Sequence, residues 1–271
     1  MGPTDVEETV TTRSFVLALV QMRVEPAARE ANLARALARI ADAAAAGAEL
    51  VLLPEALPLG WMDASTAGAA DAIPGGPTCI AFREAARRHA VHVCTGLAER
   101  AGDGIFNTAV LIDPQGAVLL HHRKINELDI AASLYGRGDR LAVARTSIGT
   151  IGVMICADAF VDGLVISHTL GHMGADIIVS PCAWAVPPDH DNARTPYGGL
   201  WRDSYAPVAR AHGLWIAGAS SVGPIATGAW AGHACIGSSL VVDPSGAPVV
   251  EGPFGPGADA LLYVRVFLTR S

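Results

Sequence analysis

The sequence has few charged residues, no basic cluster and no long uninterrupted apolar run. Only 17% of its 271 residues are charged, whereas 51% are hydrophobic, so one large domain or two ordinary ones can form a sizeable core. A net charge of −7 without a Lys/Arg cluster argues against nucleic-acid binding. The apolar stretch 33–53 contains four charged residues, so no membrane span is expected.

Cysteine is also scarce, and its pattern argues against a disulfide scaffold or a zinc knuckle. The five cysteines are odd in number, widely spaced and without a CxxC motif. Residues 1–13 lack the basic start of a signal peptide, so we expect a cytoplasmic protein. These residues are polar and acidic, and we expect them to form a disordered tail. His168 and His172 have the spacing of a helical metal pair but no third ligand, so no metal and no cofactor are expected. The cysteines are Cys79, Cys94, Cys156, Cys182 and Cys235.

Four motifs of the first half recur in the same order in the second half. Each half predicts strand, helix, strand, helix, strand, hairpin turn and strand, with a helix over 32–46 that ends at Gly47. The strands 50–53 and 177–179 are continuously apolar, as expected for strands covered on both faces. The repeat therefore predicts an α/β protein with internal pseudo-twofold symmetry, in which two sheets stack with helices outside. The recurring pairs are 16–21 with 151–156, 47–54 with 174–181, 86–89 with 209–212, and 113–116 with 243–246.

Chemically reactive side chains follow three of the predicted strands. Cys156 ends an apolar run, so its thiol is either a nucleophile that faces the loops or a small core residue. Glu55 lies in an apolar segment, where poor hydration raises the pKa of a carboxyl group and suits a general base; an ordinary solvated glutamate is the alternative. Lys124 extends from the predicted strand 117–120 and, taken alone, is only an edge charge.

Together and in this order, these residues resemble the nitrilase superfamily of carbon–nitrogen hydrolases. The resemblance runs from about Phe15 to about Tyr263. It implies a single domain, residues 14–265, folded as a four-layer αββα sandwich of two stacked mixed β-sheets with outer helices. It also implies pairing into a homodimer or a larger homo-oligomer. Further matching positions are Gln21, 107–108, 135–139, 174–176, Pro181, Trp184 and 237–238.

The resemblance also implies a catalytic triad of Glu55, Lys124 and Cys156 that acts on a small-molecule amide or nitrile. Cys156 would attack the substrate carbon as a thiolate, while Glu55 would take the thiol proton and pass it to the leaving amine. Lys124 and the backbone N–H of Ala157 would stabilise the tetrahedral intermediate. Water would then hydrolyse the thioester.

Some positions depart from the family pattern. Where many members carry a further glutamate, positions 131–133 hold two alanines and a serine, so either Glu127 or Asp129 takes that role or the role is absent. Asp158 matches a common family pattern, and capping of the following helix is the alternative to a role at the substrate. The Arg-Phe-Pro-Glu that often follows is replaced at 159–162. These changes affect the substrate assignment more than the triad.

The long segment 181–201 is expected to form a wall of the pocket. Cys182 takes the place of Glu55 in the repeat and is expected to pack or to line the pocket. Aromatic rings from this segment and from earlier loops either contact the substrate or pack the loop and a dimer contact. The substrate-contacting candidates are Trp61, Tyr135, Trp184 and His190.

An amidase-type hydrolase is the main hypothesis. Nitrile hydrolysis and acyl transfer to an amine are close alternatives, because they share the acyl-enzyme step. A catalytically silent member that binds a small molecule or a partner protein belongs to another class. A last alternative is a Cys–His pair that uses His121 or His122.

Overall fold

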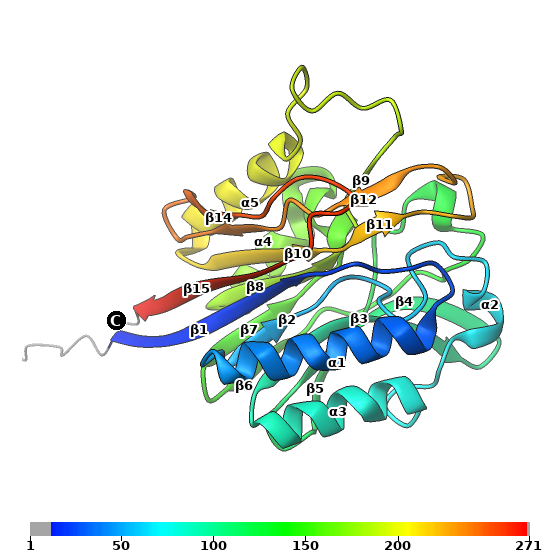
Figure 1. Ribbon diagram of the computed structural model, residues 1–271. Helices are drawn as coiled ribbons and strands as arrows, with labels where there is room; N and C mark the ends of the chain where they lie inside the picture. The colour runs from blue at the N-terminus through cyan, green and yellow to red at the C-terminus, as the bar shows by residue number, and fades with distance from the viewer. Residues whose placement is uncertain (1–11, 270–271) are drawn as a thin grey trace, which may run out of the picture.

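The five strands of the first half and the C-terminal strand form one mixed sheet of six strands in the computed structural model, which describes residues 12–269 (Figure 1). Their order is β15-β1-β2-β3-β4-β5. Most of the expected tail, residues 1–13, lies outside the described residues, and β1 already begins at Thr12. The strands are β1 Thr12–Gln21, β2 Leu50–Leu52, β3 His92–Ala101, β4 Gly104–Ile112, β5 Val118–Arg123 and β15 Ala260–Thr269.

The second half forms a sheet with the same order of equivalent strands. The order β1-β2-β3-β4-β5 of the first sheet recurs as β7-β8-β10-β13-β14 in the second, and β6 adds an edge. This topology confirms the internal repeat. The strands are β6 Val143–Thr146, β7 Gly149–Val153, β8 Ile177–Cys182, β10 Trp215–Ser220, β13 Leu240–Val242 and β14 Pro248–Glu251, with a small third sheet of β9 Ala185–Val186, β11 Val222–Pro224 and β12 Ala234–Ile236.

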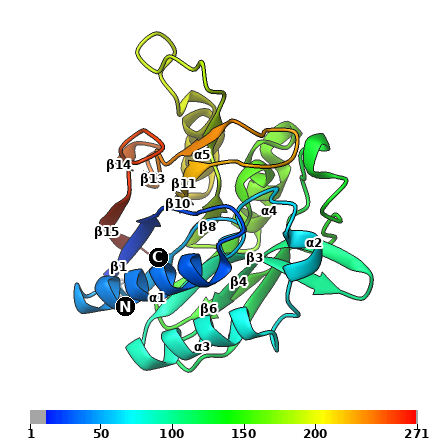
Figure 2. The same ribbon diagram turned by 45° about the vertical axis from the view of Figure 1, so that its right-hand side comes forward.

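The two sheets pack face to face, and helices cover their outer faces (Figures 1 and 2). Leu19 and Leu52 of the first sheet pack against Ile151 and Val179 of the second. Because both faces of each sheet are covered, the central strands are apolar throughout. The αββα sandwich is therefore confirmed. The helices are α1 Arg29–Ala45 and α3 Pro77–His89 on the first sheet, α4 Val165–His172 and α5 Gly199–His212 on the second, and the short α2 Thr66–Ala69, η1 Asp129–Ala131, η2 Cys156–Phe160 and η3 Asp162–Leu164.

The two hairpin turns of the repeat have the same hydrogen bonds. Asp113 Oδ1 accepts from the backbone N–H groups two and four residues later, at 2.9 and 2.8 Å. Asp243 Oδ1 does the same at 2.8 and 3.1 Å. The motif Asp-Pro-x-Gly was therefore a correct turn signal.

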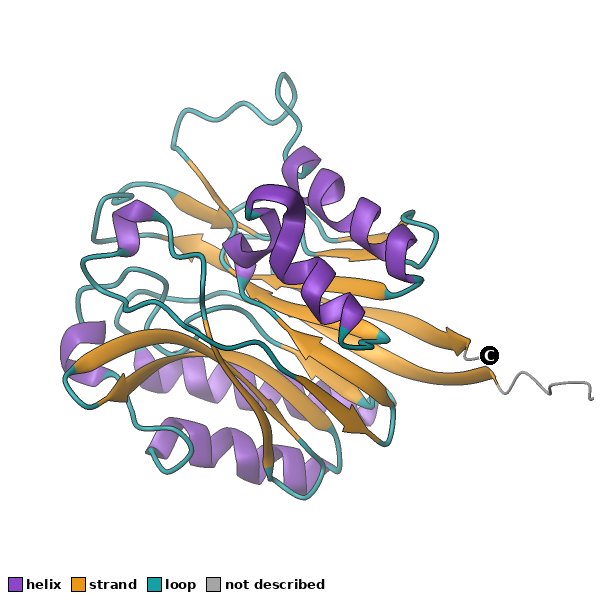
Figure 3. Cartoon of the chain, turned by 180° about the vertical axis from the view of Figure 1, so that it is seen from behind, coloured by secondary structure: helices purple, strands orange, loops and turns teal. Residues whose placement is uncertain are grey.

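The boundaries differ from the sequence expectations at several places. Strand β8 continues past Val179 to Cys182, and β15 pairs antiparallel with β1 of the same chain. The segment 181–201 contains β9 and a loop that projects from the sandwich before α5 begins (Figure 3). Among the described residues, no helix is both long and apolar enough to cross a membrane.

Candidate active site

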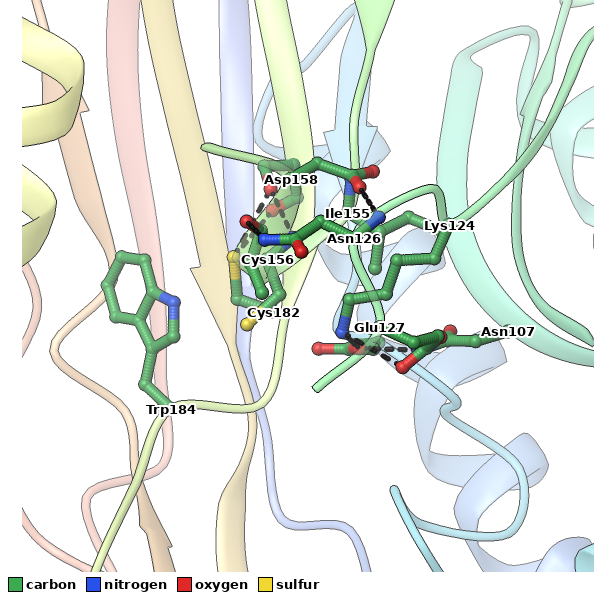
Figure 4. A network of polar contacts seen from close by, with 12 residues as sticks. Asn107, Lys124, Asn126, Glu127, Ile155, Cys156, Asp158, Cys182 and Trp184 are labelled. Atoms are coloured by element: carbon green, nitrogen blue, oxygen red, sulfur yellow. Dashed lines mark hydrogen bonds and ion pairs between the residues drawn. The ribbon is translucent and has the colours of Figure 1, made fainter. Parts of the chain in front are cut away.

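The three residues of the predicted triad lie just beyond strands β2, β5 and β7. Lys124 Nζ donates a hydrogen bond to Glu55 Oε1 at 2.7 Å, and both side chains are only 1% exposed. The charges of both groups act on the thiol of Cys156. The stacking of the sheets thus brings together a carboxylate and an ammonium group from the first sheet and a thiol from the second. Figure 4 shows Lys124 and Cys156 in this arrangement.

Glu55 is held so that one of its oxygens stays open. Asn107 Nδ2 donates to Glu55 Oε1 at 2.6 Å, while Oε2 is buried without a hydrogen-bond partner among the described residues. Gly96 of β3 allows this placement, because a Cβ atom there would lie 2.5 Å from the Cα atom of Glu55. A carboxylate oxygen with no partner is suited to accept a proton.

Cys156 occupies a tight turn at the start of η2. Its φ of 44° is in the left-handed region, which non-glycine residues adopt mainly where the surroundings impose it. The backbone N–H of Cys156 donates to Ser180 Oγ at 2.9 Å, and the residue is partly exposed. A hydrogen bond with Cys182, burial and the charge of Glu55 raise the pKa of the Cys156 thiol, against the charge of Lys124. The thiol is therefore protonated at neutral pH, and its reaction needs a base.

Lys124 remains a cation in this buried site. Burial opposes the charged form, but the carboxylates of Glu55 and Glu127 outweigh it and raise the pKa of Lys124. Its backbone N–H donates to the Asn107 carbonyl at 2.8 Å, and its carbonyl accepts from Gly138 N–H at 2.7 Å. The ammonium group is thereby held beside Glu55.

Of the two acidic residues considered for the family's further glutamate, only Glu127 contacts the lysine. Its Oε2 lies 3.7 Å from Lys124 Nζ, and its side chain is 4% exposed. Burial raises the pKa of Glu127 to about 7, with Glu55 acting in the same direction and Lys124 against it. Asp129 is exposed and begins η1, so the structure does not place it in this cluster.

Asp158 ties the loop of Cys156 to the loop of Lys124. Its Oδ1 accepts from the N–H groups of Ile125 and Asn126 at 3.0 and 2.7 Å. Its Oδ2 accepts from Ile155 N–H at 2.9 Å and from His122 Nε2 at 2.8 Å. Burial disfavours the charge, yet these bonds and the charge of His122 lower the pKa of Asp158. Asp158 is thus at the third position of η2 and caps this helix by accepting from the N–H of Ile155, which is the N-cap residue.

The carboxamide of Asn126 completes this link. Its Nδ2 donates to the carbonyl of Ala157 at 2.7 Å, which fixes the peptide group between Ala157 and Asp158. Ala157 itself is buried. The turn around Cys156 is therefore held from two sides.

Both histidines of the Cys–His alternative are bonded to carboxylates. His122 Nε2 lies 2.8 Å from Asp158, and His121 Nε2 lies 2.8 Å from Glu99. Glu99 also accepts from Arg123 at 2.7 and 2.8 Å. The side chain that reaches Glu55 from this strand is Lys124.

Three of the four aromatic candidates are buried next to these groups. The ring of Trp61 lies 5.8 Å from Lys124 Nζ and belongs to the same apolar cluster as Tyr135. Trp184 packs in the cluster that Cys156 contacts, and Figure 4 shows it on the side of the cysteine away from Lys124. His190 is more remote, in the projecting loop, where its ring contacts Phe254 at 5.8 Å.

Trp184 also lines a cavity of about 250 Å³. Trp201 stacks on Trp184 with ring centroids 4.5 Å apart, and Tyr197 lies at 6.4 Å. The indole N–H of Trp184 is buried without a hydrogen-bond partner among residues 12–269. The remaining walls include Asn192, Arg202, Ser238, Glu251 and Phe254.

A comparison with known protein families identifies the family to which this sequence belongs. The model of the carbon–nitrogen hydrolase family matches residues 16–268. The chain belongs to the carbon–nitrogen hydrolase family. This match covers nearly the whole described chain, so the family assignment rests on more than the three strand-end residues.

Several curated members of the carbon–nitrogen hydrolase family are similar in sequence. A nitrilase of Pyrococcus abyssi is 31% identical over 63% of this chain and 66% of its own length. The omega-amidase NIT2 of Danio rerio is 28% identical over 63% of this chain and 64% of its own length. The chain thus spans just under two thirds of the length of these two relatives.

Solved carbon–nitrogen hydrolase structures share the fold. A mutant of the amidase from Nesterenkonia sp. AN1, with acrylamide added at its active-site cysteine, has a TM-score of 0.77 at 22% identity. That match covers 92% of each chain. Nit3 of Saccharomyces cerevisiae has a TM-score of 0.78 at 22% identity, over 94% of this chain and 90% of Nit3.

Several residues of this carbon–nitrogen hydrolase site were not assigned from the sequence. Asn107 belonged to a matching motif, but its bond to Glu55 was not predicted. Ser180 supports the turn of Cys156, and its signal was available: it is the polar residue in an otherwise apolar strand, where the repeat has Leu53. No pattern in the sequence distinguished Gly96 and Asn126 from residues that only pack in the core.

The histidine pair considered for a metal has a neighbour from α5. His212 Nε2 lies 2.9 Å from His168 Nδ1, and its ring contacts that of His172 at 4.7 Å. Over the described range 12–269, however, no three or more His, Cys, Asp or Glu side chains are arranged to hold a metal ion.

Proposed function

We propose that the protein hydrolyses a non-peptide carbon–nitrogen bond of an amide or carbamoyl substrate through a thioester on Cys156. The observation that carries this proposal is the buried contact of 2.7 Å between Lys124 Nζ and Glu55 Oε1, next to a cysteine held in a left-handed turn. A buried ion pair beside a nucleophile supplies both a base and a fixed positive charge.

In the acylation step, Glu55 Oε2 takes the proton of the Cys156 thiol as sulfur attacks the carbonyl carbon. The oxyanion that forms is stabilised by the Lys124 ammonium group and the N–H of Ala157. Glu55 then passes its proton to the departing ammonia or amine as the carbon–nitrogen bond breaks. The acyl group remains on sulfur as a thioester.

In the deacylation step, a water molecule takes the place of the amine. Glu55 removes its proton as the water oxygen attacks the thioester, and the same two donors stabilise the second oxyanion. Glu55 returns the proton to the Cys156 sulfur when the acid leaves. Asn107 acts as a positioning residue for Glu55, and Glu127 does so for Lys124.

The acyl part of the substrate is proposed to extend past Trp184 into the aromatic cavity. Trp184 is shared by the surroundings of Cys156 and by the cavity, and a volume of about 250 Å³ admits an aromatic or branched group. The buried indole N–H is available to donate a hydrogen bond to a polar atom of the substrate. Trp61 and Tyr135 would face the opposite side, near Lys124 and Glu55.

Two alternatives remain open. Nitrile hydrolysis or acyl transfer to an amine would use the same thioester, and the relative from Pyrococcus abyssi is a nitrilase. A catalytically silent member would bind a small molecule without forming the thioester. A homodimer or larger homo-oligomer also stays a prediction, which sedimentation of the purified protein tests. A cytoplasmic location is a separate prediction.

A substrate panel tests the proposal. Aliphatic and aromatic amides, carbamoyl amines, ω-amides and nitriles are incubated with the protein, with ammonia release and the intact mass as readouts. We expect ammonia release and an acyl adduct on Cys156 with at least one amide, and neither with Cys156→Ala. A nitrile that is turned over while no amide is would replace the amide assignment.

Thiol labelling separates an active site from a silent one. Iodoacetamide near neutral pH should modify Cys156 faster than the buried Cys79 and Cys235, and Glu55→Gln should remove this preference. Equal labelling of the three cysteines would count against an activated thiol. The far-UV spectrum of Glu55→Gln should match that of the unchanged protein, which would show that the lost preference is not caused by unfolding.

A further inference from the structure

A second thiol lies beside the nucleophile candidate, and the proposed reaction does not use it. β7 and β8 pair in parallel, with Val153 opposite Val179, so Cys156, just after β7, and Cys182, the last residue of β8, lie at the same end of the sheet. The thiol of Cys182 is close enough to Cys156 to raise the pKa of its thiol. Figure 4 shows them side by side at the ends of their strands.

The backbone and a shared hydroxyl group hold both cysteines in place. Ser180 Oγ accepts from the N–H of Cys156 at 2.9 Å and lies 3.4 Å from the sulfur of Cys182. The carbonyl of Cys182 accepts from the N–H groups of Glu55 and Ser221, both at 3.2 Å.

The two cysteines differ in solvent exposure, as expected for a reactive thiol and a resolving thiol. Cys156 is partly exposed, so a small oxidant can reach it, whereas Cys182 is fully buried behind it. The other three cysteines pack in separate parts of the core: Cys94 between the sheets, Cys79 on the buried face of α3 and Cys235 in the cluster of Trp61. They provide matched controls within the same chain.

We propose that Cys182 is the resolving thiol of a redox site at Cys156, and that its oxidant is a small hydroperoxide. In the first step, Glu55 takes the proton of the Cys156 thiol as its sulfur attacks one oxygen of the peroxide; the O–O bond breaks, a sulfenic acid forms, and the departing oxygen leaves with that proton as water (or an alcohol). In the second step, the sulfur of Cys182 attacks the sulfenic sulfur. The S–S bond forms, the S–O bond breaks, and the hydroxyl group leaves as water with the proton of Cys182.

The disulfide protects the nucleophile. The two thiols give two electrons to the peroxide, and a dithiol reductant returns them by thiol–disulfide exchange. Without Cys182, the sulfenic acid would be open to a second peroxide and would proceed to the sulfinic acid, which dithiols do not reduce. The site thus converts an irreversible loss of Cys156 into a reversible block.

The test uses the full chain, hydrogen peroxide and dithiothreitol. After peroxide treatment, we expect an intact mass lower by two hydrogen atoms, a non-reducing peptide map with Cys156 joined to Cys182, and recovery of both thiols with dithiothreitol. In Cys182→Ser we expect Cys156 to gain two oxygen atoms and to stay blocked after reduction. Cys235→Ser should behave as the unchanged protein does.

Two results would overturn the proposal. The first is oxidation of Cys156 in the unchanged protein to the sulfinic acid without a Cys156–Cys182 peptide. The second is equal recovery of Cys156 in Cys182→Ser and in the unchanged protein. Because mass and thiol counts are the readouts, the result is independent of whether the proposed hydrolysis is observed. The peptide map of the unchanged protein decides the question even if Cys182→Ser fails to fold.

Discussion

The backbone N–H of Glu55 donates to the carbonyl of Cys182 at 3.2 Å. These two residues occupy equivalent positions of the internal repeat, at the ends of β2 and β8. The pseudo-twofold relation therefore brings the two equivalent strand ends into direct contact. In one half the position carries the proposed base, and in the other it carries the thiol next to the nucleophile candidate.

Replacing Lys124 should affect both reaction and stability. We expect Lys124→Met to lower kcat for the best amide by about 100-fold or more, since one donor to the oxyanion is lost. Leaving Glu55 without its buried partner should also lower the free energy of unfolding by about 3–5 kcal/mol. Ammonia release by the folded protein and urea unfolding measure the two effects. A Lys124→Met protein with unchanged kcat would contradict the proposed role.

The close approach of Gly96 to Glu55 gives a second prediction. A methyl group in Gly96→Ala would lie 2.5 Å from the Cα atom of Glu55, so the backbone of Glu55 must move. We expect the free energy of unfolding to fall by about 1–3 kcal/mol and kcat to fall with it. Gly68→Ala is the matched control, because nothing lies within 4 Å of a Cβ atom there. Equal kcat values for the two variants would show that the position of Glu55 is not constrained by β3.

Asp158 should make the protein sensitive to acid. Its pKa is lowered in the folded state, so its contribution to stability is present above the unfolded pKa of about 3.9 and is lost as the pH falls through the folded value. Asp158→Asn should lower the free energy of unfolding at pH 7 by about 1–3 kcal/mol. Between neutral and acidic pH, the free energy of unfolding should fall more steeply for the unchanged protein than for the variant. An equal dependence on pH in the two proteins would exclude this linkage.

For Glu127 we expect stability to depend on pH with the opposite sign. Its pKa is raised to about 7 in the folded protein, so stability should fall as the pH rises from the unfolded value of about 4.3 to about 7. The rate of Cys156 labelling by iodoacetamide should show an inflection near pH 7, since the charge beside Lys124 changes there. Glu127→Gln should lose the inflection, whereas Asp129→Asn, at an exposed position, should keep it. An inflection retained in Glu127→Gln would assign it to another group.

The aromatic cavity should select the acyl group. Phe254 lines the cavity at its exposed side, so Phe254→Ala should raise KM for an aromatic amide by about 2- to 10-fold and leave acetamide unchanged. Val249→Ala is a control in the neighbouring strand β14, at an exposed residue that does not line the cavity. If both substrates respond equally to Phe254→Ala, the cavity is not the acyl pocket.

Much of the fold was predictable because its signals are local or repeated. The two Asp-Pro-x-Gly turns and the continuously apolar strands 50–53 and 177–179 predicted the two equivalent halves, and the strand order confirmed them. The site was predictable only as three strand-end residues. Which acidic residue lies near Lys124 could not be read from spacing, because Glu127 and Asp129 are only two residues apart and the path of the loop decides between them.

The sequence by itself determined the layers, the repeat and the order of Glu55, Lys124 and Cys156, because the periodicity of apolar residues and turn motifs depends on near neighbours along the chain. Only the tertiary structure decided that Asp158 links two loops, that Ser180 supports the turn of Cys156, and that Cys182 lies against both Cys156 and Glu55. These contacts join residues far apart in the chain. They exist because two stacked sheets bring their strand ends to one edge in a fixed register.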